Sequence, residues 1–343
     1  MEASLTRNCP KGRTMFEKAS LADLPAFHVG HAQNVQAATG CTVVIAPEGA
    51  TCSVDVRGGG PATRETDLLK PENMVEAVHA VVLSGGSAFG LAASTGVMDE
   101  LAKRNIGFEI AGTRVPIVVG ACLFDIVFGE NTYPDAAMGA KAASIALDDA
   151  SLPDEGNVGA GCGATVGKML DPTQAMKSGL GICGVRLGDV IAVAIVAVNA
   201  LGTVVDFDGT PLAGHRDASG AIMDPLAPVC LMTENAAADD KGLEATTGPC
   251  ANTTIGVVLT NAKITKAQAQ KISSITHDAY ARAIKPVHTS ADGDTIFTMA
   301  SGEVEAPFDL VGVLSTEAMQ GAIVRAAKNA KGSHGLPAAC DLD

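Results

Sequence analysis

The sequence contains no tryptophan, and aromatic residues make up only 3% of its 343 positions. Its hydrophobic fraction is nevertheless 47%, which is sufficient for a sizeable core. A core without large rings must be built mainly from Ala, Val, Ile and Leu. Together with 38 glycines, this composition favours tight packing of helices on sheets over aromatic clusters.

Basic residues are also scarce, with 24 Lys and Arg against 38 Asp and Glu, and the formal charge is −14 at pH 7. No longer segment carries the stripe of Lys and Arg that phosphates require, so we expect no nucleic-acid partner and no anionic membrane surface. The stretch 1–18 lacks the apolar region of a signal peptide, and no apolar run approaches transmembrane length. These absences predict a cytoplasmic protein.

The nine cysteines form no CxxC pair. Their odd number and irregular spacing are typical of reduced, packed thiols in a cytosolic protein. We therefore expect no disulfide framework and no metal, and nothing in the sequence calls for a cofactor.

Alternating strand and helix patterns predict an α/β or α+β sandwich. A Pro47–Gly49 turn is expected to join the first two strands, and residues 208–250 are expected to form a long surface linker. The expected strands span 41–46, 52–56, 80–83, 115–119, 121–127, 180–187, 189–198, 203–206, 253–259 and 295–299. The expected helices span 88–104, 136–147, 266–284 behind a Thr265–Gln268 capping box, and 316–331 behind Ser315.

The most glycine-rich segment, residues 154–168, resembles two nucleotide-binding motifs without satisfying either. Gly159, Gly161 and Ala164 have the dinucleotide spacing but do not follow an apolar strand, and a P-loop would need glycine where Cys162 stands. What remains is a flexible backbone that delivers Lys168 into an uncharged neighbourhood. A lone lysine is more often a solvated surface residue.

A turn-forming run ends at Asn252, and Thr253 begins a β-branched, apolar strand. If the chain were cut between them, the new α-amine of Thr253 could act as the general base for its own hydroxyl. The alternative is a strand that simply begins with threonine.

Two other positions could serve such a nucleophile. Asn199 ends a strand that is apolar on both faces, where its amide could donate to an oxyanion or cap a turn. Asp292, Gly293 and Asp294 lack the further ligands of a calcium loop, but the two carboxylates could hold an ammonium group.

With these residues in view, the sequence resembles the self-processing L-aminopeptidase/D-esterases and β-peptidyl aminopeptidases, and within them most closely the nylon-oligomer (6-aminohexanoate oligomer) endohydrolases. The resemblance runs from about residue 29 to the last helix. The segments that carry it are 159–168, 186–190, 252–255, 260–261, 286–289 and 292–295.

The resemblance implies an αββα sandwich that cuts itself into an α fragment, 1–252, and a β fragment, 253–343, which stay together in one domain. Thr253 would be the nucleophile of an amide hydrolase, and a small amide or peptide would be its substrate. Lys168 would be a cation beside it, Asn199 would lie near the oxyanion, and Asp292 and Asp294 would position the nucleophile. The family also implies a homotetramer.

The chain departs from the family at Phe124, where a tyrosine is common, so a hydroxyl contact in the substrate site is lost. The threonine nucleophile with Asp292 and Asp294 matches the nylon-oligomer pattern and not the serine pattern of the β-peptidyl enzymes. Exo-aminopeptidase and endo-amidase activity both stay open. Three alternative functions also stay open: an acyltransferase on the same fold, a non-catalytic protein on the same fold and, more remotely, a nucleotide-binding enzyme.

Overall fold

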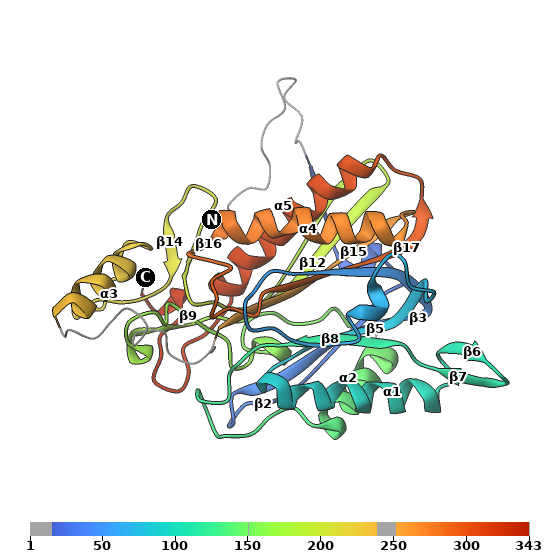
Figure 1. Ribbon diagram of the computed structural model, residues 1–343, viewed down its shortest axis with the longest axis horizontal. Coiled ribbons are helices and arrows are strands. Elements are labelled where there is room, and N and C mark those ends of the chain that lie inside the picture. The colour runs from blue at the N-terminus through green and yellow to red at the C-terminus, as the bar shows by residue number, and fades with distance from the viewer. Residues whose placement is uncertain (1–15, 150, 239–251, 343) are drawn as a thin grey trace.

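A computed structural model describes residues 16–149, 151–238 and 252–342. Its centre is a ten-stranded sheet with helices on its outer faces (Figure 1). The strands follow the order β1-β11-β12-β15-β17-β3-β5-β8-β4, and β2 pairs with β3. The fold places strands from distant parts of the sequence side by side.

The strands of the main sheet are β1 (Glu17–Ala19), β2 (His28–Asn34), β3 (Thr39–Val56), β4 (Ala62–Arg64), β5 (Ala77–Ser84), β8 (Val118–Cys122), β11 (Leu180–Leu187), β12 (Val190–Asn199), β15 (Thr253–Ala262) and β17 (Thr295–Val304). The smaller strands are β6 (Phe108–Ile110), β7 (Thr113–Val115), β9 (Thr165–Val166), β10 (Met176–Lys177), β13 (Thr203–Val205), β14 (Pro211–Ala213) and β16 (Ile284–Lys285). The α-helices are α1 (Ala92–Lys103), α2 (Ala136–Asp148), α3 (Ala227–Ala238), α4 (Lys266–Ala283) and α5 (Phe308–Lys328).

Three apolar layers divide the molecule. The central layer joins residues of β3, β5 and β8 to residues of β12, β15 and β17, so the two halves of the sheet face each other. Helices α4 and α5 close the outer face of one half, and α1 and α2 close the outer face of the other. The predicted αββα sandwich is confirmed.

The long strand β3 connects the two halves. Residues 39–45 pair with β2 and β5, whereas residues 51–56 pair with β17. The turn predicted at Pro47–Gly49 is wrong. The chain instead remains in strand conformation through an irregularity between Ile45 and Ala50, because a bulge adds residues and bends a strand without ending its pairing.

Helix α4 has the predicted capping box, in which Gln268 N–H donates to Thr265 Oγ1 at 3.2 Å and Thr265 N–H donates to Gln268 Oε1 at 2.9 Å. The last helix begins earlier than predicted, after Pro307 and not at Ser315. Ser315 lies inside α5 with its hydroxyl bonded to the Val311 carbonyl at 2.7 Å, an arrangement that removes the need for a cap there.

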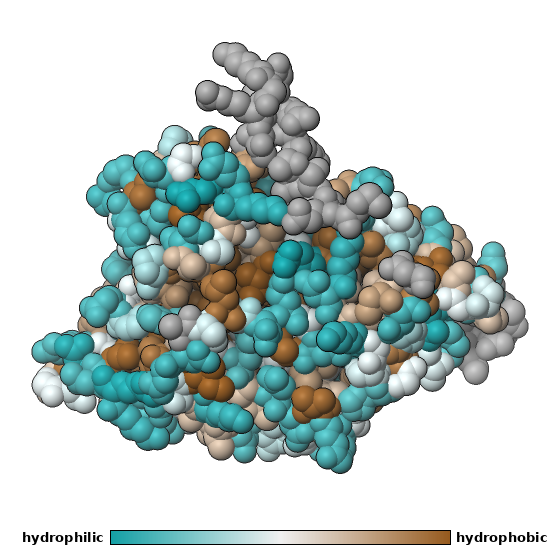
Figure 2. Space-filling view, turned by 180° about the vertical axis from the view of Figure 1, so that it is seen from behind, coloured by the Kyte–Doolittle hydropathy of each residue, from teal (hydrophilic) through white to brown (hydrophobic). Residues whose placement is uncertain are grey.

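Residues 208–250 contain more structure than a linker, because β14 and α3 both lie within them. Residues 239–251 of that segment lie outside the described part of the chain. None of the helices in the described ranges is both long and apolar enough to cross a membrane. Seen from behind, the surface is largely polar, with apolar residues gathered in a recess (Figure 2).

Close contact between β11 and α5 generates a stability prediction. A Cβ added at Gly181 would lie 2.0 Å from the Ala322 carbonyl oxygen, whereas one added at Gly312, within α5, would meet only Ile275 at 3.5 Å. Gly181→Ala should therefore lower the free energy of unfolding by about 1–3 kcal/mol. Gly312→Ala should leave it unchanged or raise it by up to about 1 kcal/mol. Urea denaturation measures both, and a Gly181→Ala protein as stable as the parent would contradict the packing.

Candidate active site

The predicted site residues meet at one end of the sheet. Asn199, the last residue of β12, lies opposite Thr253, the first residue of β15. Asp292 and Asp294 precede β17, which runs parallel to β15, so the beginnings of both strands reach the same edge. All four are buried, with exposed fractions between 0% and 4%. Alternation along the strands puts Asn199 and Thr253 on the face of the central apolar layer.

Lys168 joins this group through Asn199. Its Nζ donates to Asn199 Oδ1 at 2.8 Å and to the Asn199 carbonyl at 3.1 Å. Thr165 N–H also donates to Oδ1, at 3.0 Å, while Asn199 Nδ2 donates to the Phe124 carbonyl at 2.9 Å. The amide of Asn199 is therefore oriented, with its oxygen toward the lysine and its nitrogen toward Phe124.

Phe124 reaches this network through its backbone oxygen, which a residue of any type supplies. Its ring is half-buried. The loss of the family's tyrosine hydroxyl therefore leaves the contact with Asn199 intact.

Burial dominates the electrostatics of the site. It lowers the pKa of Lys168 to about 7, although the charges of Asp292 and Asp125 oppose the shift. Burial also raises the pKa of Asp292, and the charge of Asp294 raises it further, while hydrogen bonds from Thr289 and the charge of Lys168 work against the rise. A pKa of about 7 gives Lys168 access to both its charged and its neutral form near neutral pH.

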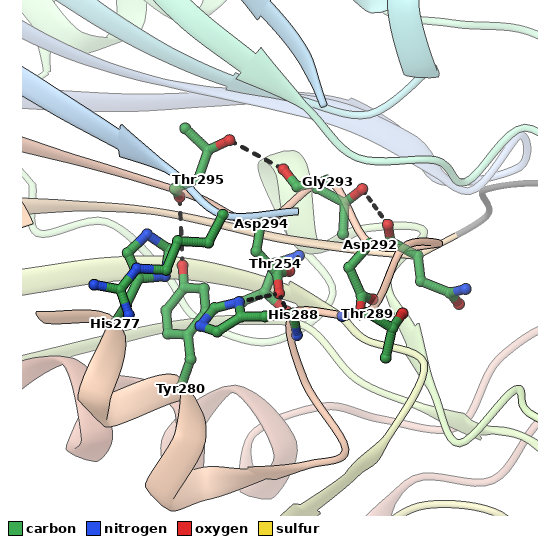
Figure 3. Close-up of polar contacts among 12 residues, drawn as sticks. Thr254, His277, Tyr280, His288, Thr289, Asp292, Gly293, Asp294 and Thr295 are labelled. Atoms are coloured by element: carbon green, nitrogen blue, oxygen red, sulfur yellow. Dashed lines mark hydrogen bonds and ion pairs between the residues drawn. The ribbon is translucent and has the colours of Figure 1, made fainter. Parts of the chain in front are cut away.

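The two carboxylates have different partners. Asp292 Oδ2 accepts from the backbone N–H and the hydroxyl of Thr289, at 2.8 and 2.7 Å. Asp294 Oδ1 accepts from Thr254 N–H at 2.8 Å, and its Oδ2 pairs with His288 Nδ1 at 2.8 Å (Figure 3). Asp294 thus fixes the position of the backbone N–H of Thr254, the residue that follows Thr253.

The peptide bond between Asn252 and Thr253 lies within this network. The Asn252 carbonyl oxygen accepts from Gly293 N–H at 3.0 Å and from the Thr253 hydroxyl. A Cβ at Gly293 would lie 2.7 Å from Thr253 Oγ1, so the loop can approach this closely only with glycine there. A hydroxyl and a backbone donor therefore converge on one carbonyl group.

The glycine-rich segment has a structural role. Gly159 to Gly167 are buried, and the backbone N–H groups of Gly159, Ala160 and Thr165 donate to side chains of the protein. A phosphate-binding loop instead presents its N–H groups to the ligand. This use of the donors argues against a nucleotide-binding enzyme.

Sequence reasoning missed three contributors. Gly293 contributes its backbone N–H, which donates to the Asn252 carbonyl. His288 contributes its ring, which contacts Asp294, whereas the sequence predicts only that it lies in a loop. The third is Lys177, which is fully buried and donates to the carbonyls of Gly161, Ala164 and Ser178 at 3.2, 2.8 and 2.6 Å. The residue types of Gly293 and Lys177 carry no signal that separates them from a turn glycine or a surface lysine.

Comparison with known proteins identifies the family of the chain. Residues 19–335 match the model of Peptidase family S58. The chain belongs to this family. Its S58 membership makes it a hydrolase of the peptidase and amidase class.

Two relatives show the range of names within S58-like sequences. The chain is 39% identical over 305 residues to an uncharacterized aminopeptidase of Mycobacterium leprae, covering 84% of this chain and 80% of the relative. It is 30% identical over 321 residues to a 6-aminohexanoate-oligomer endohydrolase of Paenarthrobacter ureafaciens, covering 89% and 85%.

Solved structures show the same fold at low sequence identity. A β-aminopeptidase of Burkholderia sp. aligns with a TM-score of 0.65 and 17% identity over 97% of this chain and 93% of that one. An L-aminopeptidase D-Ala-esterase/amidase from Ochrobactrum anthropi, described as a variant of the Ntn-hydrolase fold, aligns with a TM-score of 0.60 and 16% identity, over 91% and 88%. The S58 chain therefore has an Ntn-hydrolase-type fold.

The buried Lys177, which bonds to carbonyls of the glycine-rich segment, generates a pH prediction. Burial lowers the pKa of Lys177 to about 7. Above that pH the unfolded chain binds more protons than the folded one, so stability rises with pH, by up to about 1.4 kcal/mol per pH unit for each such lysine. Lys177→Met should therefore reduce the slope of stability against pH between about 7 and 8.5, a comparison in which the cysteines are the same in both proteins.

Urea denaturation across this range measures the slope. Lys168 is present in both proteins, and the charge of Lys177 is the smallest of the causes that shift its pKa, so its contribution to the slope nearly cancels. The variant should be less stable at each pH, because three carbonyls lose their donor. Equal slopes for the two proteins would show that Lys177 stays charged when buried.

Proposed function

We propose that this S58 protein is a self-processing amide hydrolase in which Thr253 becomes the N-terminal nucleophile. The observation that carries the proposal is the convergence of the Thr253 hydroxyl and the Gly293 N–H on the Asn252 carbonyl. The half-buried Lys168 and the buried Asn199, Asp292 and Asp294 lie at the same end of the sheet, with groups that can move protons and stabilise charge.

The first stage is cleavage of the chain. Thr253 Oγ1 attacks the carbonyl carbon of Asn252, and its proton passes to the neutral form of Lys168 and on to the leaving nitrogen. The peptide C–N bond breaks as the C–O bond of an ester forms, and Gly293 N–H stabilises the oxyanion. Water then hydrolyses the ester. Lys168 is the base at this stage because the nitrogen of Thr253 is still an amide and cannot accept a proton.

The second stage is turnover of a small amide or peptide. The free α-amine of Thr253 now takes the hydroxyl proton, and the hydroxyl attacks the substrate carbonyl to form an acyl-enzyme that water resolves. Asn199 Nδ2, which carries a second hydrogen besides the one donated to the Phe124 carbonyl, would assist the oxyanion, and Asp292 and Asp294 would supply negative charge beside the new amine. The relatives named aminopeptidase and oligomer endohydrolase both support an amide substrate.

The sheet explains how fragments 1–252 and 253–343 would stay together. Strand β15 of the smaller fragment pairs with β12 of the larger, and β17 of the smaller fragment pairs with β3 of the larger. Cleavage at the start of β15 breaks none of these pairings. Assembly into a homotetramer, which rests on the family resemblance, and a cytoplasmic location, which rests on the sequence composition, are further parts of this proposal.

Replacing the nucleophile tests the scheme directly. Thr253→Ala should abolish self-cleavage and turnover, whereas Thr253→Ser, which keeps a hydroxyl, should retain both at reduced rates. Denaturing mass spectrometry should find fragments 1–252 and 253–343 in the parent and an intact chain in Thr253→Ala. A Thr253→Ala protein that still splits at this bond excludes the mechanism.

Two substitutions distinguish a basic Lys168 from a cationic one. If the neutral amine takes the proton, self-cleavage should accelerate as pH rises through about 7 and then level off. Lys168→Met and Lys168→Arg should then both slow cleavage by about 100-fold or more, since arginine stays charged and cannot accept a proton. Timed denaturing gels measure the rates. Cleavage by Lys168→Arg at the parental rate would assign the residue a purely cationic role.

A further inference from the structure

His288 is the partner of Asp294 and takes no part in the two chemical stages of the proposed function. Its Nδ1 lies 2.8 Å from Asp294 Oδ2, and its backbone N–H donates to the same oxygen at 3.2 Å. Figure 3 shows the ring between Asp294 and the side chains that α4 contributes. One residue thus makes both contacts to this carboxylate oxygen.

The position of the His288 ring is fixed by packing. It stacks on Tyr280 with ring centroids 5.9 Å apart and meets His277 edge-on at 4.8 Å. His277 is itself anchored, since its Nε2 lies 3.1 Å from the Asp55 carbonyl oxygen. Burial lowers the pKa of His277 to about 4, so this neighbour is uncharged at neutral pH. The ring of His288 therefore has a rigid and neutral support.

The backbone of His288 is in the left-handed region, with φ of 57°. For a residue other than glycine this conformation is unfavourable and persists where surrounding contacts require it. Here the conformation allows both the ring and the backbone N–H to face one oxygen atom of Asp294.

The surroundings decide which ring nitrogen makes a hydrogen bond. His288 Nε2 is buried and has no hydrogen-bond partner within the described residues. Because a carboxylate oxygen accepts, Nδ1 is the nitrogen that donates to Asp294.

A continuous chain of contacts runs from this ring to the nucleophile. His288 holds Asp294 Oδ2, Asp294 Oδ1 accepts from Thr254 N–H at 2.8 Å, and Thr254 follows Thr253. We propose that His288 is a positioning residue that orients Asp294 and, through the Thr254 amide, the backbone of the nucleophile. This inference rests on the proposed function.

Three substitutions separate the hydrogen bond from the ring and the backbone. His288→Asn keeps a donor near the place of Nδ1 and tolerates a positive φ. His288→Gly tolerates the same φ without a donor. His288→Phe keeps the stacked ring without a donor. Each is measured for the rate of self-cleavage, for kcat and KM of the processed enzyme on an amino-acid p-nitroanilide, and for its melting temperature.

We expect His288→Asn to process itself and turn over within about threefold of the parent, and the Gly and Phe variants to lose about 10- to 100-fold, as when an outer partner of a functional group is removed. The loss should fall on kcat and on self-cleavage, with KM nearly unchanged, and it should exceed what any fall in the melting temperature explains.

Several results would overturn the inference. These are a Phe variant as active as the parent, an Asn variant as slow as the Gly variant, or losses that simply follow the melting temperature. Thr253→Ala, measured in parallel, reports on the proposed function itself. Retained activity there would refute the nucleophile whatever the His288 variants do. An inactive Thr253→Ala beside a fully active His288→Phe would refute the positioning role alone.

Discussion

The antiparallel pairing of β12 with β15 is the constraint on which the site depends. Alternate residues of β12 enter different apolar layers, with the isoleucines on the central face and mainly alanines and valines on the helical face. A slip of one residue would exchange these two sets, so the register is strongly specified. The same register sets Asn199 opposite Thr253. Hydrophobic packing along the strand thus fixes the placement of two polar groups at its end.

The electrostatic properties of the site follow from that placement. Because the polar groups lie at the end of the central apolar layer, each charge loses hydration and must be compensated by the protein. Lys168 is bonded to both oxygens of Asn199, and Asp292 and Asp294 each accept at least two hydrogen bonds. Burial still lowers the pKa of Lys168 to about 7. The fold therefore produces an amine that can exchange protons near neutrality, as general acid and base catalysis requires.

The strand expected at 121–127 is wrong beyond Cys122, where β8 ends. Sequence patterns nevertheless located most of the strands and the start of β15 at Thr253, because burial and β-branching are local signals. They failed at Pro47–Gly49, where pairing on both sides of β3 overrides a turn signal, and at Ser315, where α5 continues through a residue that resembles a cap. The grouping of Lys168 with Asp292 came from family resemblance and not from spacing. The role of Gly293 as a hydrogen-bond donor could not be predicted from its residue type, because every residue except proline carries a backbone N–H.

On the proposed mechanism, the uncut chain occupies its own active site. The Asn252 carbonyl lies between the Thr253 hydroxyl and the Gly293 N–H, and Asn252 itself is only 5% exposed. Cleavage followed by departure of residue 252 would leave the Gly293 donor facing the space in which a substrate carbonyl must lie. The same N–H group can then stabilise the oxyanion of both stages, while the base changes from Lys168 to the new amine. Self-cleavage and turnover would thus share one carbonyl position and differ in the group that accepts the proton.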